Sequence, residues 1–327
     1  MNHQTDTSKL VFTASEANAF AVQQIAALRT GKLKGVPFGV KRVDEKMTHW
    51  MPGYLVTITA RPGHAKTSLA LNHANWYQSV LSGIPDNKTA CIICCWEQSV
   101  ENLVLYDFAR QTGIPMSKMA RGEVDDLEFD SINGAGICHS ASGLFYVGFS
   151  DRIQGKRPPM TIETVHTALT QIKEWAGPNS YRIGPVYLDY LQRITPSLRT
   201  HESKAVAIGA VVDECKELAL SWGTQAILTC QAKPQVDTWD DPQPKEDCIE
   251  WTNNGDKAGD CNLSLLRPSK YKGEGEMCGD VRVQGKWQLG VQINKQKMGD
   301  APFREWLVFD VSTCQLKGAL SQHNLND

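Results

Sequence analysis

Short apolar runs alternate along the chain with segments in which apolar residues recur every three or four positions. The first pattern is typical of buried strands and the second of amphipathic helices, so their alternation predicts an α/β fold. We expect a mainly parallel sheet with helices on both faces. The expected strands span residues 55–59, 90–95, 144–147, 186–188, 225–229, 263–266, 287–294 and 306–310, and the helices include 99–111, 161–175 and 205–222. The last three strands lack long helices between them, which predicts an antiparallel edge.

Residues 13–30 precede that alternation and carry a helix-start signal. Thr13 and Glu16 form a capping-box pattern. Apolar residues follow at helical spacing: Phe20, Ala21, Ile25 and Leu28. The helix could pack on its own domain or dock as an arm on a neighbouring subunit, and periodicity does not separate the two. The chain therefore divides into an N-terminal arm with a linker-type helix (1–36), one core domain (37–320) and a tail (321–327).

Composition describes an ordinary globular chain. Of its 327 residues, 41% are hydrophobic and 21% charged. No run approaches the ~18 apolar residues of a membrane span, and the polar start is unlike a signal peptide. We therefore expect no membrane segment and a cytoplasmic location. The formal net charge of −2 offers no independent support for nucleic-acid binding.

Ten cysteines raise the question of zinc or disulfides. Cys91 and Cys94 have metal-ligand spacing, but they lie in a β-branched apolar run, and no second such pair accompanies them. We predict buried, reduced thiols.

The segment after the first strand has the pattern of a phosphate-binding loop. Backbone N–H groups of such a loop bind phosphates, a lysine neutralises them and a hydroxyl reaches Mg²⁺. Ala60 and Ala65 replace the two glycines of the usual pattern, so an ordinary strand–turn–helix connection with a solvated Lys66 remains the alternative. The candidate nucleotide-binding residues are Arg61, Pro62, Gly63, His64, Ala65, Lys66, Thr67 and Ser68.

Polar residues end three other expected strands. Asp189 follows one strand and is suited to hold the water shell of Mg²⁺, although it could simply cap a turn. Glu97 follows another and could act as a general base on water. Gln231 could sense a γ-phosphate by hydrogen bonding. Ligands of open α/β sheets bind at this carboxyl edge, so we expect these side chains near Lys66.

With these residues in place, the chain from about residue 38 to about 316 closely resembles the C-terminal ATPase domain of DnaB-type replicative helicases, within the RecA-like ATPases. The order and spacing of the blocks is more specific than the loop alone. The blocks are Ala60-Arg61-Pro62 before Lys66-Thr67, Trp96-Glu97 before Glu101-Asn102-Leu103, Leu188-Asp189-Tyr190-Leu191-Gln192, Lys216-Glu217-Leu218-Ala219, Cys230-Gln231, Gly255 with Asp260, and Asn294-Lys295-Gln296-Lys297-Met298-Gly299.

The resemblance implies an ATP-driven motor that requires Mg²⁺. Thr67 and Asp189 would hold the metal, partly through water, Glu97 would be the catalytic base and Gln231 the γ-phosphate sensor. In the family, nucleotide lies between subunits of a ring, commonly of six, that moves 5′-to-3′ on single-stranded DNA and has loader or primase partners. A lysine and an arginine reach across from the neighbour, and Lys295 and Lys297 stand at those positions.

Two departures bear on that comparison. Ala65 would cost about 1–3 kcal/mol if its position requires a positive φ. Only about 40 residues precede the ATPase domain, so we expect a minimal phage-like or mobile-element-like form without the family's N-terminal helical domain.

The segment that would contact DNA, residues 233–262, is acidic. It holds three lysines against eight carboxylates, a formal balance of −5. That charge disfavours phosphate binding, whereas residues 267–304 carry eight basic residues against four acidic ones. The candidate DNA contacts are Lys233, Gly255 and Lys257.

Two functions therefore stay open. One is a DNA-translocating helicase. The other is a regulatory or scaffold ATPase of the same fold, whose nucleotide state controls assembly or a partner without unwinding.

Overall fold

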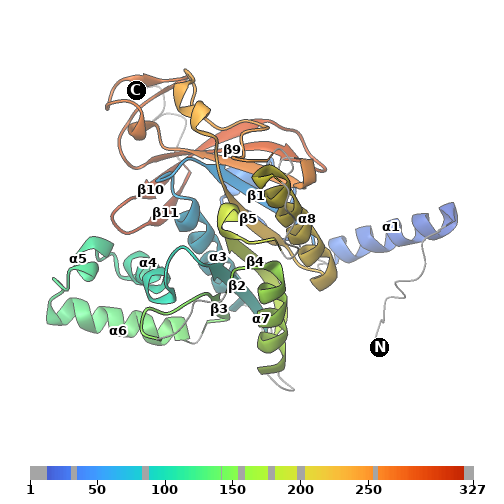
Figure 1. Ribbon diagram of the computed structural model, residues 1–327, viewed down its shortest axis with the longest axis horizontal. Helices are drawn as coiled ribbons and strands as arrows, with labels where there is room; N and C mark the ends of the chain where they lie inside the picture. The colour runs from blue at the N-terminus through green and yellow to red at the C-terminus, as the bar shows by residue number, and fades with distance from the viewer. Residues whose placement is uncertain are drawn as a thin grey trace.

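The computed structural model describes residues 13–30, 35–82, 88–140, 142–153, 159–175, 181–196, 203–252 and 257–319. Within these residues, nine strands form one sheet in the order β11-β10-β9-β6-β1-β5-β4-β2-β3 (Figure 1). Its strands are β1 (Leu55–Ala60), β2 (Thr89–Cys95), β3 (Leu144–Val147), β4 (Arg182–Asp189), β5 (Ala226–Gln231), β6 (Cys261–Leu266), β9 (Gln288–Gln296), β10 (Phe303–Asp310) and β11 (Gln315–Ala319).

The pairing confirms a mainly parallel sheet with an antiparallel edge. Six neighbouring strands, β3, β2, β4, β5, β1 and β6, pair in parallel. On the other side of β6, the strands β9, β10 and β11 continue the sheet with antiparallel pairing. β6 therefore belongs to both parts, because it runs parallel to β1 and antiparallel to β9. The sequence patterns missed β11, whose five residues pair only with β10 at the edge of the sheet.

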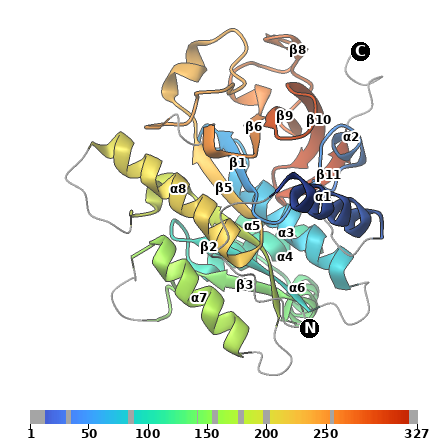
Figure 2. The same cartoon turned by 90° about the vertical axis from the view of Figure 1, so that its right-hand side faces the viewer.

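Helices cover both faces of the sheet, as Figure 2 shows. The strand β2 illustrates this burial on both faces. Cys91, Ile93 and Cys95 join the core under α3. Ala90, Ile92 and Cys94 join the core under α7 and α8. Side chains alternate along a strand, so a strand buried on both faces is apolar throughout. The helices are α1 (Ala14–Arg29), α2 (Lys41–Asp44), α3 (Lys66–Ser82), α4 (Val100–Thr112), α5 (Met116–Ala120), α6 (Asp126–Ser140), α7 (Ile162–Trp175) and α8 (Lys204–Trp222).

Several elements escaped the sequence patterns. α5 and α6 lie between β2 and β3, and α6 exposes Leu127, Phe129 and Ile137 instead of a single polar face, so its periodicity is weak. A two-stranded hairpin, β7 (Met277–Cys278) with β8 (Val281–Arg282), also formed where no strand was expected.

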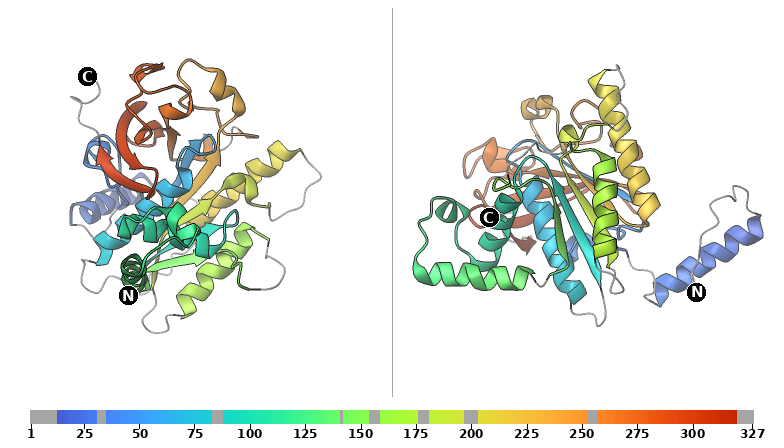
Figure 3. Two further views of the ribbon diagram at one scale, coloured as in Figure 1. Left: turned by 90° about the vertical axis from the view of Figure 1, so that its left-hand side faces the viewer. Right: turned by 60° about the horizontal axis from the view of Figure 1, so that its bottom comes forward.

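The expected N-terminal helix is present as α1. Thr13 and Glu16 form the predicted capping box, in which Thr13 N–H donates to the Glu16 carboxylate at 2.9 Å. None of the described residues of α1 is buried, and Figure 3 shows the helix standing apart from the sheet and its covering helices.

The chain after β5 folds back onto the end of that strand. An isolated bridge joins Ala232 to Ile249, Lys233 N–H donates to the Cys248 carbonyl at 2.8 Å, and Glu250 N–H donates to the Gln231 carbonyl at 2.8 Å. A 3₁₀ turn at Pro234–Thr238 lies inside this fold-back. We call residues 232–252 the post-β5 segment.

All ten cysteines fall within the described residues and are free thiols, with Cys138 exposed and the others buried. The Cys91–Cys94 pair lies in β2, as its apolar setting predicts. Over the described part of the chain, no three His, Cys, Asp or Glu side chains gather as a metal site, and no helix has the length and apolar character to cross a membrane.

Candidate functional site

The phosphate-binding loop connects the buried strand β1 to the first turn of α3. Gly63 has a φ of 76° and Ala65 a φ of 65°, so the loop turns through left-handed backbone at both positions. Lys66 begins α3, and its ammonium donates to the Ala60 carbonyl at 3.0 Å and the Arg61 carbonyl at 3.3 Å. The Lys66 ammonium is therefore enclosed by its own loop. Burial lowers the pKa of Lys66, and the nearby Asp189 carboxylate opposes that lowering.

Asp189 is the buried centre of the site. The parallel register places it opposite Cys95 on β2. Thr67 donates its hydroxyl to Oδ2 at 2.7 Å, and Thr229 donates to Oδ1 at 2.5 Å. A buried carboxylate requires such donors, and here they join β4, β5 and α3 around one charge.

A cavity of about 350 Å³ opens over this carboxylate. Its walls bring together Lys66, Thr67, Glu97, Asp189 and Gln231, which come from strand ends and one helix start. The loop residues Pro62, Gly63, Ala65 and Ser68 also line it. The volume and this mixed polar lining suit a small anionic ligand.

The pKa of Glu97 is raised, first by burial and then by the neighbouring Asp189 carboxylate. Arg193 and Lys66 oppose that rise. A carboxyl group with a raised pKa, at a cavity wall, is suited to exchange protons.

Two loop residues predicted to bind nucleotide do not line the cavity. Arg61 donates to Asp237 at 2.9 Å and to the Ala232 carbonyl at 3.0 Å, so it ties the loop to the post-β5 segment. His64 is buried, and its Nδ1 accepts the Arg267 N–H at 2.9 Å. Burial and the nearby Arg267 lower the pKa of His64 to about 3, so the ring is neutral and structural.

Arg267 and Tyr106 line the cavity and were missed by the sequence analysis. Arg267 follows β6, so it stands at a strand end like the residues that were found. Its guanidinium donates to the Gly63 carbonyl at 3.0 Å and the Lys286 carbonyl at 3.2 Å. Burial lowers the pKa of Arg267. The partly desolvated guanidinium therefore places a positive charge at the cavity wall.

Residues 35–311 match the family described as DnaB-like helicase C terminal domain. The chain belongs to this family. It is 26% identical over 277 residues to the replicative DNA helicase DnaB of Helicobacter pylori, covering 82% of this chain and 53% of the relative. It is 22% identical over 271 residues to the replicative DNA helicase DnaC of Bacillus subtilis, covering 83% of this chain and 54% of that protein.

The chain thus spans about half the length of the curated relatives it matches. Among solved structures, an isolated ATPase domain aligns with a TM-score of 0.77 at 19% identity, covering 95% of this chain and 100% of that one. A DnaB-like replicative helicase, solved in a study of its interactions with primase, aligns with a TM-score of 0.75 at 18% identity over 95% of this chain and 68% of its own. These two likenesses show a shared RecA-like fold.

Lys295 and Lys297, which the sequence analysis predicts to act on a neighbouring subunit, do not line the cavity of their own chain. Lys297 pairs with Asp260 at 3.0 Å, which raises the lysine's pKa, and Lys295 donates to the Lys257 carbonyl at 3.0 Å. Asp260 also accepts from Lys216 at 2.6 Å and from the Leu55 N–H at 2.9 Å. Both lysines are therefore held by contacts to residues that do not line the cavity.

Among the predicted DNA contacts, Lys233 donates to the Asp247 carbonyl at 2.6 Å, and Lys257 is exposed. Gly255 lies outside the described residues.

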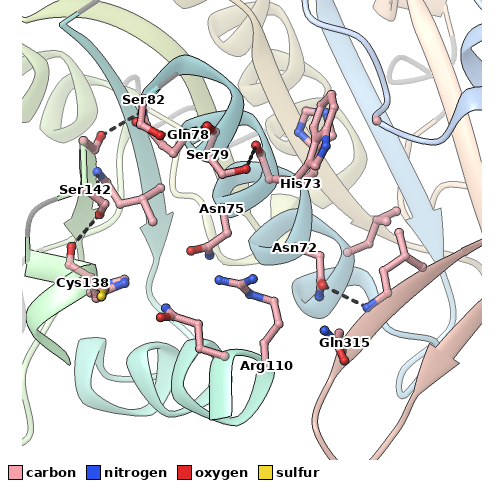
Figure 4. A pocket seen from close by; sticks show the side chains of 18 of the residues that line it. Asn72, His73, Asn75, Gln78, Ser79, Ser82, Arg110, Cys138, Ser142 and Gln315 are labelled. Atoms are coloured by element: carbon pink, nitrogen blue, oxygen red, sulfur yellow. Dashed lines mark hydrogen bonds between the residues drawn. The ribbon is translucent and has the colours of Figure 1, made fainter. Parts of the chain in front are cut away.

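A larger cavity, of about 830 Å³, lies between α3, α4 and β11 and is lined by none of the predicted site residues. Figure 4 shows Asn75 of α3 and Arg110 of α4 facing its interior. Beside it, the buried Asp107 carboxylate accepts from Asn75 at 2.5 Å and from Tyr146 at 2.6 Å. This network joins α3 and α4 to β3 and accounts for the buried charge.

The φ of 65° at Ala65 generates a stability prediction. A Cβ in left-handed backbone is strained, so Ala65→Gly should raise the free energy of unfolding by about 1 kcal/mol, as measured in urea. The matched control is Ala210→Gly in the exposed interior of α8, which should lower it by about 1 kcal/mol. Equal destabilisation by both substitutions would show that Ala65 is unstrained.

Proposed function

We propose that this chain is the ATP-hydrolysing motor of a DnaB-type helicase, which forms a ring of six subunits and moves 5′-to-3′ along single-stranded DNA in the cytoplasm during replication. The observation that carries the proposal is that Lys66, Thr67, Glu97, Asp189 and Gln231 line the same cavity. Family membership supports the same conclusion. A primase is named with one solved relative, and we include a primase or loader among the partners.

In this proposal the loop N–H groups and Lys66 bind the phosphates of ATP. The hydroxyl of Thr67 and the carboxylate of Asp189 are hard oxygen donors 2.7 Å apart, which fits a Mg²⁺ site, held partly through water. The metal would supply charge neutralisation on the phosphates. Glu97 takes a proton from the attacking water, and Gln231 hydrogen-bonds the γ-phosphate, so its end of β5 senses hydrolysis.

Lys295 and Lys297 complete the site of the neighbouring subunit. Neither lysine lines the cavity of its own chain, which supports a role in trans. A lysine lacks the planar fork of arginine, so Lys297 would stabilise the transition state as a point charge. Asp260, which pairs with Lys297 in the single chain, would compete with the neighbour's phosphate for that charge.

The N-terminal arm, residues 1–36, serves ring assembly. Val22 and Ile25 of α1 expose 65% and 58% of their surface and lie three positions apart on the helix. A capped helix with exposed apolar residues is suited to pack on a neighbouring copy.

In this proposal, the post-β5 segment contacts DNA, together with Gly255 and Lys257 that follow it. The eight acidic residues against three lysines in residues 233–262 favour the second candidate function, a regulatory or scaffold ATPase that does not unwind. Dependence of ATP turnover on DNA separates the two candidates.

Steady-state ATP hydrolysis should rise severalfold on addition of single-stranded DNA. Glu97→Gln should retain nucleotide binding and lose hydrolysis by about 10²- to 10⁴-fold, because the general base is removed while the phosphate contacts remain. Lys66→Ala should lose nucleotide binding and serves as the blank. Turnover that ignores DNA would favour the regulatory ATPase, and intact turnover in Glu97→Gln would remove Glu97 as the base.

Mixing two inactive variants tests the trans role of Lys297. Glu97→Gln and Lys297→Ala chains, mixed in equal amounts before assembly, should regain ATP turnover, because about a quarter of the interfaces then combine an intact Glu97 with an intact Lys297. A mixture of Glu97→Gln with the doubly substituted chain is the control and should stay inactive. If both mixtures stay inactive, Lys297 does not act across the interface.

Light scattering tests the arm. Serine at both Val22 and Ile25 should shift the molar mass from ring to monomer, because the apolar contact with the neighbour is lost. Serine at both Gln23 and Gln24 changes exposed polar residues of the same helix turn and should leave the ring intact. Rings that survive the first substitution would assign α1 a role outside assembly.

A further inference from the structure

We propose that Trp251 is a stacking platform for the bases of single-stranded DNA, in a groove between the post-β5 segment and the start of α8. The inference rests on the proposed function, because it assigns a mode of DNA contact to the helicase motor. It concerns a site distinct from the ATP cavity, since the two share no lining residue among those described.

The groove has a volume of about 680 Å³. From α8 it is lined by Ala205, Val206, Gly209, Ala210 and Asp213, three of which are small residues. Lys233, Trp251 and Thr252 of the post-β5 segment complete the lining. An aromatic side chain beside small residues leaves space for a planar ring to stack on it.

Trp251 is unusually exposed for a tryptophan, and its backbone conformation is strained. The residue exposes 47% of its surface and has a φ of 70°, a backbone conformation that bulky side chains rarely adopt. Backbone strain of this kind is concentrated at functional sites. The Lys204 ammonium lies 4.3 Å from the centroid of the Trp251 ring, so the two side chains form a cation–π contact.

The chemistry of the groove favours a nucleic-acid base. Base stacking on an aromatic side chain needs little positive charge and tolerates any sequence. This property matters here because residues 233–262, the segment that contains Trp251, hold eight carboxylates against three lysines, so contacts to phosphate alone would be weak. Lys204 adds a positive charge beside Trp251, Lys233 lines the groove while donating to the Asp247 carbonyl, and Asp213 on α8 disfavours a phosphate at its own position.

A short chain of hydrogen bonds connects the groove to the nucleotide site. Gln192 accepts the Gln231 N–H at 3.1 Å and donates to the carbonyls of Gln231 and Glu250 at 3.4 and 3.3 Å. Glu250 N–H donates to the Gln231 carbonyl at 2.8 Å, and Trp251 is the next residue. A displacement of Gln231 on hydrolysis is therefore passed to Trp251 through two contacts, which would let ATP turnover move a stacked base.

The test compares two oligonucleotides by fluorescence anisotropy, in the presence of a non-hydrolysable ATP analogue. One is oligothymidylate, and the other has the same length and phosphates but abasic sugars. Wild type should bind oligothymidylate between about 5-fold and about 150-fold more tightly, which is the range expected for a stacked base. Trp251→Ala should bind both oligonucleotides alike, with the salt dependence of binding unchanged, because no charge is removed.

Three further variants separate stacking from other effects of the substitution. Trp251→Phe retains a flat ring and should keep most of the preference, whereas Trp251→Leu retains apolar bulk without a π-face and should behave like Trp251→Ala. Trp239→Ala is the matched control: this tryptophan exposes 39% of its surface and has Lys245 5.9 Å from its ring, but it does not line the groove. It should leave the preference intact.

The failures of this test are distinguishable. If wild type binds no single-stranded DNA, both this inference and the helicase proposal are wrong. A preference for bases that survives in Trp251→Ala overturns the stacking role alone. If Trp251→Ala keeps that preference but no longer assembles into a ring of subunits, the groove holds a neighbouring subunit. This outcome also overturns the stacking role. The comparison of the two oligonucleotides on wild type remains informative even if a variant does not fold.

Discussion

The site depends on the parallel hydrogen bonding of β1 to β5 on one side and β6 on the other. Parallel strands place their carboxyl ends at one edge of a sheet, and burial on both faces leaves little freedom to shift the register. Ala60 therefore lies opposite Gln231, and Cys95 lies opposite Asp189. The phosphate-binding loop, the buried carboxylate and the candidate sensor meet because the strand ladders align them, and the loops add only the last few residues.

The Asp189 carboxylate concentrates the electrostatics at that edge. It is buried, so its charge must be balanced by donors, and the hydroxyls of Thr67 and Thr229 supply them. The same charge contributes to the raised pKa of Glu97 and opposes the lowering of the Lys66 pKa by burial. One buried group therefore organises the candidate metal, base and phosphate positions together.

Beyond the cavity, polar contacts extend the sheet edge into the post-β5 segment. Arg61 ties the phosphate-binding loop to Asp237, and Gln192 ties the end of β5 to Glu250. These contacts are directional, so the segment is positioned by the same strand ends that line the cavity. In a motor, such a connection is what couples hydrolysis to a surface that contacts another molecule.

The sequence by itself determined most of the strand and helix pattern and nine of the residues that line the cavity. Every expected strand overlaps one in the sheet, because apolar runs and periodicity report the burial of each residue in its local element. Lys66, Glu97, Asp189 and Gln231 were found because strand ends are visible in sequence. Periodicity does not say which distant residue a side chain meets. Only the tertiary structure therefore decided that His64 is held by Arg267, that β11 pairs at the edge and that Trp251 faces α8.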